Sequence, residues 1–102
     1  MSEQLIAKHP NISMLVNNAG LDHYGLLEDI EPWKLKSIMD TNMMPHVILS
    51  KYFAMYFRIR EHPRSCIINN TSVASTGATP NFLTYSCTKV FLDFVTRAFN
   101  FE

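Results

Sequence analysis

Two short apolar runs constrain the fold of this chain more than any other feature. They are ISMLVNN, residues 12–18, and CIINNTS, residues 66–72. Neither run alternates apolar with polar residues, and this is typical of strands in a parallel sheet that is covered on both faces. Each run passes directly into polar residues, so each predicted strand ends in a polar loop. The pattern predicts an α/β fold.

Helical patterns precede and separate the two runs. Residues 2–11 are typical of the end of a helix that stops near Pro10, because proline disfavours helix in the residue before it. Residues 32–60 space their apolar side chains as one long helix does. Pro32 suits the first turn of that helix, and Pro45 should distort it.

A last helix is predicted from about Thr84 to the end of the chain. Its predicted buried side consists of Phe91, Phe94, Val95, Ala98 and Phe99. Two strands joined by a helix form a right-handed crossover and lie parallel. We therefore expect part of a Rossmann-like, doubly wound fold, with two parallel strands and about three helices. In such sheets ligands bind at the carboxyl ends of the strands.

Composition excludes several functional classes. The chain of 102 residues is one domain at most, and its nine basic and nine acidic residues cancel. It therefore offers no basic patch for nucleic acid or an anionic membrane. No apolar run approaches the roughly 20 residues of a membrane span. The two cysteines and four histidines show no metal-ligand spacing, so we expect free thiols and no metal site.

Tyr85 and Lys89 lie one helical turn apart in YSCTK. Residues four apart share a helix face, with Cβ atoms about 6 Å apart. A lysine ammonium near a phenol favours the phenolate and lowers the pKa of a tyrosine. Such a tyrosine can exchange a proton with a substrate oxygen near neutral pH. The alternative is an exposed helix face on which the lysine is near the ring by chance.

Ser72 and Asn42 are further candidates. If the loop after residue 72 folds back, the Ser72 hydroxyl can polarise a carbonyl that Tyr85 protonates; otherwise Ser72 is a turn or cap residue. Asn42 precedes Pro45, which has no N–H for the carbonyl of Thr41. The opened turn can hold an ordered water for a proton relay. The alternative for Asn42 is a solvent-facing side chain without a role.

Asn17 and Asn18 end the first apolar run. Amides at a strand end can hold neighbouring loops together, or they can contact a ligand in the crevice. Their spacing does not separate these two roles.

Four motifs together resemble the short-chain dehydrogenase/reductase family, in the family's order and close to its spacing. They are LVNNAG at 15–20, MDTNMM at 39–44, NTSVAS at 70–75 and YSCTK at 85–89. The resemblance extends over essentially the whole chain. The residues Phe91, Asp93 and Phe94 after the lysine look most like the branch of steroid 17-beta-dehydrogenases and very-long-chain 3-oxoacyl-CoA reductases.

The resemblance implies a role for each candidate. Tyr85 is the proton donor, and Lys89 is its cationic partner and a hydrogen-bond donor to the nicotinamide ribose. Ser72 holds the substrate oxygen, and Asn42 anchors the water of a proton relay. The residues implied to contact the cofactor are Asn18, Ala19, Gly20, Tyr85 and Lys89.

The resemblance also implies the reaction and its partners. A carbonyl of 3-oxoacyl or keto-steroid type is reduced to a hydroxyl with NADP or NAD, and NADP is favoured. The substrate is a small carbonyl or alcohol, of lipid or steroid character, and helix packing gives a homo-oligomer. The expected compartment is the cytoplasm, or the cytosolic face of the endoplasmic reticulum if the full-length protein carries a membrane anchor.

One departure from the family concerns its glycine-rich turn, whose backbone amides hold the pyrophosphate. The only glycines are Gly20, Gly25 and Gly77, and none forms such a turn. The later strands of the family are also missing. Residues 1–102 are therefore expected to be a partial domain that does not turn over substrate alone. An oxidoreductase fragment and a non-catalytic remnant that associates with partner chains both stay open.

Overall fold

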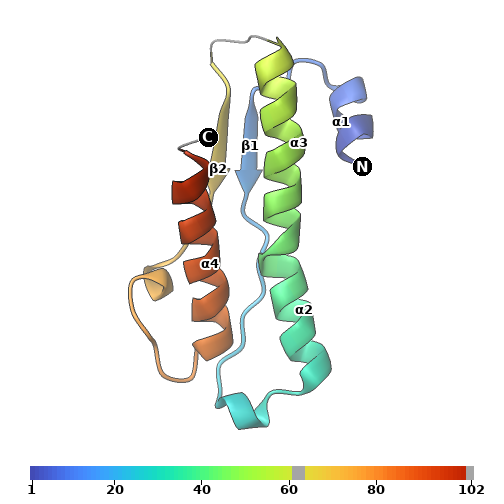
Figure 1. The fold of residues 1–102 in the computed structure, drawn as a ribbon. Helices are drawn as coiled ribbons and strands as arrows, with labels where there is room; N and C mark the ends of the chain where they lie inside the picture. Colours follow the sequence, from blue (N-terminus) through green and yellow to red (C-terminus); the bar gives the residue numbers. More distant parts are fainter. Residues whose placement is uncertain (61–63, 101–102) are drawn as a thin grey trace.

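The structure of the protein is a computed structural model, and it describes residues 1–60 and 64–100. The elements in chain order are α1 (Ser2–Lys8), β1 (Met14–Asn17), η1 (Leu27–Asp29), α2 (Pro32–Asn42), α3 (Met44–Arg60), β2 (Cys66–Asn69), η2 (Val73–Ser75) and α4 (Leu83–Phe99). Here η1 and η2 are single 3-10 turns. Figure 1 shows two strands side by side, with long helices running along them and the short helix α1 at the outer side of α3.

The two strands pair in parallel, as predicted. Met14 is opposite Cys66, and Asn17 is opposite Asn69. Both strands are shorter than the predicted runs, with four residues each. After Asn17 the backbone leaves the sheet, and Leu21 bonds to the side chain of Asn42 instead of to a neighbouring strand.

The sheet is covered on one face only in the described part of the chain. Asn17 bonds to Ser50 of α3, and its register partner Asn69 bonds to Thr96 of α4, so both helices lie on the same face. On the other face Met14 and Val16 are each 53% exposed. The prediction of strands covered on both faces is therefore wrong for the described residues, because no described helix packs against Met14 and Val16.

The predicted long helix is two helices that meet at Met43. The backbone of Met43 departs from helical geometry, with φ −115° and ψ −72°. Pro45 causes the break, since it provides no N–H for the carbonyl of Thr41 and the helical hydrogen bonding is interrupted there. The predicted distortion is confirmed, while the prediction of one continuous helix is wrong.

The buried side of α4 differs from the predicted one. Phe94 is 71% exposed and Ala98 is also exposed, whereas Thr88 and Leu92 are buried. The other predicted core residues, Phe91, Val95 and Phe99, are half-buried. Polar partners on β2, the loop after it and α2 face this helix, so its inner side carries Thr88, Lys89 and Thr96 beside Leu92. Three large apolar residues of the helix are exposed: Leu83, Val90 and Phe94.

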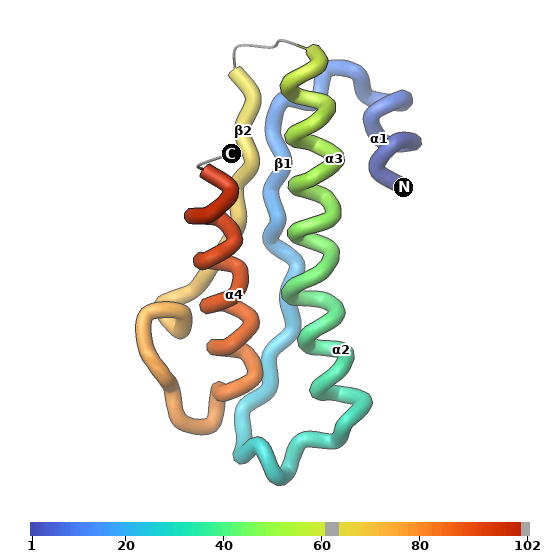
Figure 2. Tube along the Cα trace, viewed as in Figure 1, coloured from blue at the N-terminus to red at the C-terminus, as the bar shows by residue number. Residues whose placement is uncertain are grey.

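Few apolar side chains are fully buried among the described residues: Ile38, Phe53 and Leu92. The chain after β1 runs between α4 and the α2–α3 pair (Figure 2), so hydrogen bonds cross the interior where apolar contacts are sparse. No helix in the described ranges is long and apolar enough to cross a membrane.

Asn17 joins both strands to α3. Its Nδ2 lies 2.7 Å from Asn69 Oδ1, 3.0 Å from Ser50 Oγ and 3.4 Å from the carbonyl oxygen of His46. The side chain is buried, with 3% of its surface exposed. This amide therefore has a structural role, which was one of the two roles left open for it.

We expect Asn17→Asp to lower the free energy of unfolding by about 2–3 kcal/mol, because it buries a carboxylate among acceptors and removes the Nδ2 donor. Urea unfolding followed by circular dichroism measures the change. The exposed Asn11 provides a matched control, and Asn11→Asp should stay within about 0.5 kcal/mol of the parent. Equal stability of the two variants would contradict the structural role of Asn17.

Candidate functional site

A small cavity lies at the carboxyl end of the strands, between the loop after β1 and the first half of α4. Its volume is about 320 Å³, and it is lined by Asn18, Gly20, Leu21, Asp22, Asn70, Tyr85 and Lys89. Four of the predicted site residues meet here: Asn18, Gly20, Tyr85 and Lys89. Ser72, Asn42 and Ala19 lie outside its lining.

Asn70 and Asp22 line the cavity but were not predicted as site residues. Asn70 follows β2 at the same point where Asn18 follows β1. Its polarity at a strand end was therefore a signal that could have identified it. Asp22 lies in a loop without motif or periodicity, and no sequence signal marks it.

Lys89 is a buried cation directed at the strand ends. Only 3% of its surface is exposed, and its Nζ donates to the backbone carbonyl of Asn70 at 2.8 Å. The same Nζ lies 5.5 Å from the centre of the Tyr85 ring. Asn70 Nδ2 in turn donates to Asn18 Oδ1 at 2.8 Å. The ammonium, the phenol and the two strand-end loops therefore form one connected group.

Asn42 connects the loop after β1 to α4. Its Oδ1 accepts from Leu21 N at 2.7 Å, and its Nδ2 donates to Leu21 O at 2.8 Å and to Thr88 Oγ1 at 3.0 Å. Thr88 Oγ1 donates to the carbonyl of Tyr85 at 2.8 Å. Asn42 is 1% exposed, so the alternative of a solvent-facing side chain is wrong. Its anchoring of a relay water stays a prediction.

Ser72 is the N-cap of η2. Its hydroxyl accepts from Ala74 N at 3.2 Å, and its carbonyl accepts from Ser75 Oγ at 2.6 Å. The cap role that was the alternative for Ser72 is therefore present. Helix α4 packs against η2, the 3-10 turn that Ser72 caps. The contact of Ser72 with a substrate oxygen stays a prediction.

Sequence reasoning missed His46. This residue of α3 is 2% exposed, and its Nε2 lies 2.9 Å from the carbonyl oxygen of Ala19. A carbonyl only accepts, so Nε2 carries the proton and donates it. Burial lowers the pKa of His46 below its ordinary value, the positive charge of Lys89 lowers it further, and the bond to Ala19 opposes both. His46 was grouped with histidines that lack metal spacing, and no local pattern distinguished it.

In the described ranges, no three His, Cys, Asp or Glu side chains lie close enough to hold a metal ion. The group that can bind a ligand is the Lys89 ammonium with the cavity around it. An ammonium has three N–H donors, and the Asn70 carbonyl takes one of them. The cavity can therefore bind a ligand with hydroxyl acceptors beside a phenol that can transfer a proton.

Comparison with known proteins gives consistent matches. The sequence model of the family described as short chain dehydrogenase matches residues 1–102. Hydroxysteroid dehydrogenase-like protein 1 of Gallus gallus is 30% identical over an aligned stretch of 102 positions, and the match covers 93% of this chain and 29% of that protein.

Two solved structures superpose closely on this one. A metagenomic short-chain oxidoreductase in complex with NADP does so with a TM-score of 0.84 at 24% identity, over 95% of this chain and 43% of its own. A 4-hydroxyisoleucine dehydrogenase complexed with NADH and succinate gives 0.86 at 24% identity, over 96% of this chain and 45% of its own. These likenesses confirm the Rossmann-like fold. Because the family model matches every residue, the chain belongs to the short chain dehydrogenase family.

Proposed function

We propose that residues 1–102 form the central part of an NAD(P)-dependent oxidoreductase domain that reduces a carbonyl to a hydroxyl. The observation that carries this proposal is the buried Lys89 ammonium beside the Tyr85 ring in one cavity with Asn18 and Gly20. The chain spans 29% of the length of its relative from Gallus gallus, so the activity of the whole protein is part of the proposal.

The residues in the cavity fit the ribose end of a nicotinamide cofactor. Lys89 Nζ has N–H donors beyond the one that Asn70 takes, and these suit ribose hydroxyls. Asn18, Ala19 and Gly20 would lie along the adenosine side. One of the two superposed structures is a complex with NADP and the other a complex with NADH, so they support either nucleotide. The resemblance to the family favours NADP. When bound, the cofactor supplies the hydride.

The protein's part of the reaction is proton transfer and orientation. As the substrate carbon accepts a hydride, its oxygen gains negative charge, and the Tyr85 hydroxyl donates a proton to it. The charge of Lys89 stabilises the phenolate that remains. Ser72 would orient the substrate oxygen, and a water anchored at Asn42 would return a proton to Tyr85.

An apolar substrate of keto-steroid or 3-oxoacyl type is supported by two observations. One is the name of the relative from Gallus gallus, a hydroxysteroid dehydrogenase-like protein. The other is a mainly apolar cavity of about 730 Å³ at the start of α4, lined by residues 25–27, residues 75–81 and the first two turns of that helix. Leu83 and Ser86, on either side of Tyr85 in the sequence, line this cavity. It has room for the apolar part of such a substrate.

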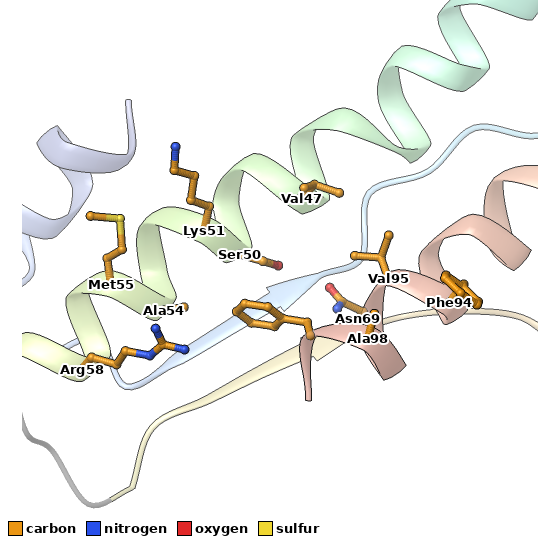
Figure 3. A pocket seen from close by; sticks show the side chains of 11 residues that line it. Val47, Ser50, Lys51, Ala54, Met55, Arg58, Asn69, Phe94, Val95 and Ala98 are labelled. Atoms are coloured by element: carbon orange, nitrogen blue, oxygen red, sulfur yellow. The ribbon is translucent and has the colours of Figure 1, made fainter. Parts of the chain in front are cut away.

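We also propose that a second copy of this chain packs against the groove between α3 and α4. Figure 3 shows side chains of both helices around this groove, with Asn69 at its floor. Its volume is about 480 Å³, and Phe94 on its α4 side is largely exposed. Exposed apolar surface of this kind marks interfaces. The alternative function, a non-catalytic chain that only associates with partner chains, is supported by this groove alone.

In a complete domain that contains residues 1–102, Tyr85→Phe should lower carbonyl reduction by several orders of magnitude, because it removes the proton donor and keeps the ring. The loss of NADPH absorbance with a 3-oxoacyl or keto-steroid substrate measures the rate. Tyr52→Phe, on the exposed side of α3, is the matched control and should keep the parental rate. A folded Tyr85→Phe protein with parental activity would rule out the mechanism and favour the non-catalytic alternative.

The proposed association predicts dimers or larger species at micromolar concentration. Phe94→Ser should shift the chain toward monomer in sedimentation, because it removes apolar area from the groove. Val73→Ser changes an apolar residue outside the groove that is even more exposed than Phe94, and it should leave the distribution unchanged. A parent chain that sediments as a monomer would overturn the proposal.

A further inference from the structure

The loop after β1 is held by side chains instead of by the sheet. Asn42 bonds to both backbone groups of Leu21, at 2.7 and 2.8 Å. Two residues earlier in the loop, the carbonyl of Ala19 accepts from His46 Nε2 at 2.9 Å. Asn42 and His46 lie one helical turn apart, on the two sides of the break at Met43. Together they hold the backbone of the segment that carries Asn18 and Gly20.

His46 is itself held in place. Its ring is buried, and its backbone carbonyl lies 3.4 Å from Asn17 Nδ2, at the end of the strand that leads into the loop. Its other ring nitrogen, Nδ1, is buried and has no hydrogen-bond partner among the described residues. The ring therefore presents one donor, and that donor is directed at Ala19.

We propose that His46 is a positioning residue that holds the Ala19 carbonyl and thereby keeps Asn18 and Gly20 in place against the cofactor. This inference rests on the proposed function as far as the cofactor is concerned, whereas the hold on the loop is a property of the chain itself. His46 does not line the cavity and touches no reacting atom, so it acts through the loop.

A cationic His46 would keep its Nε2–H donor to the Ala19 carbonyl, but it would bury a charge, so the neutral ring is the form that the folded chain favours. A proton on Nδ1 would have no acceptor and would add a positive charge near Lys89 of α4. The groups that hydrogen bonds place beside His46 are neutral: the Ala19 carbonyl bonds to its ring, and the Asn17 amide of β1 bonds both to its backbone carbonyl and to Ser50 of the same helix. Burial and the Lys89 charge accordingly lower the pKa of His46.

The sign of the pH effect follows from this lowered pKa. Between the ordinary value of about 6.5 and the lower folded value, the unfolded chain binds a proton that the folded chain does not. The contribution of His46 to the free energy of unfolding is therefore fully present above about pH 6.5. It is lost as the pH drops from there toward the lower pKa of the folded chain. One group changes the folding equilibrium constant by at most about tenfold per pH unit.

Hydrogen exchange tests the hold on the loop in the 102-residue chain without any cofactor. The amide of Leu21 reports loop geometry, and the amide of Cys66, which donates to Ser13 in the sheet, reports the rest of the fold. His46→Leu removes the donor and should speed exchange at Leu21 about tenfold or more while Cys66 is unchanged. His46→Gln keeps an N–H donor and should restore most of the protection. His9→Leu changes an exposed histidine and is the matched control.

The second arm measures the cofactor in the complete domain. His46→Leu should raise the KM for NADPH about tenfold and leave kcat within about twofold, and His46→Gln should lie near the parent. NADPH affinity of the parent should weaken as the pH falls through the lowered pKa of His46 in the folded domain, which lies below 6.5, and that of His46→Gln should not weaken in that range.

The outcomes of the two arms are distinguishable. If exchange at Leu21 is unchanged in His46→Leu, His46 does not hold the loop. The same follows if His46→Gln loses as much protection at Leu21 as His46→Leu does. Faster Leu21 exchange with an unchanged KM for NADPH overturns the link to the cofactor. Absence of NADPH binding in the parent domain overturns the proposed function and the link to the cofactor, while the exchange arm still decides whether His46 holds the loop.

Discussion

Buried amide side chains hold this structure together, because its apolar core is small. Only three apolar residues are fully buried in the described ranges, whereas Asn17 and Asn42 are buried and bonded to groups on several elements. Each such hydrogen bond adds only about 1 kcal/mol to the free energy of unfolding. A buried polar group that is left without its partner lowers it by up to about 3 kcal/mol. The amides therefore specify which elements pack together more than they add to total stability.

The same network supports the candidate site. Asn42 holds Leu21 on one side and Thr88 on the other, and Thr88 bonds to the carbonyl of Tyr85. Lys89 bonds to the loop after β2, which bonds to the loop after β1 through Asn18. A site whose loops are held by buried side chains keeps its geometry better than one on free loops. A structural residue and a cavity residue are therefore neighbours at the end of β1: Asn17 holds the sheet, and Asn18 lines the cavity.

Much of the fold followed from local patterns in the sequence. The apolar runs gave the parallel pair, Pro45 gave the helix break, and the Tyr85–Lys89 spacing placed both side chains on one cavity. The errors concern contacts between distant residues. Phe94 turned outward because the inner face of α4 meets polar groups of other elements, and His46 acquired its role from Ala19, 27 positions away. Neither contact leaves a periodic or spaced signal in the sequence.

Lys89 gives a physical reason to locate function here that is independent of any family likeness. Burial of an ammonium costs several kcal/mol unless a carboxylate pairs with it. The ion pairs in the described ranges, Lys36–Asp40 and Arg97–Asp93, lie toward the surface, and the acceptor that Lys89 reaches is a neutral carbonyl. The Asp22 carboxylate lines the same cavity as this ammonium, and under the proposed function the phenolate of Tyr85, whose ring centre lies 5.5 Å from Nζ, would be a second negative charge near it.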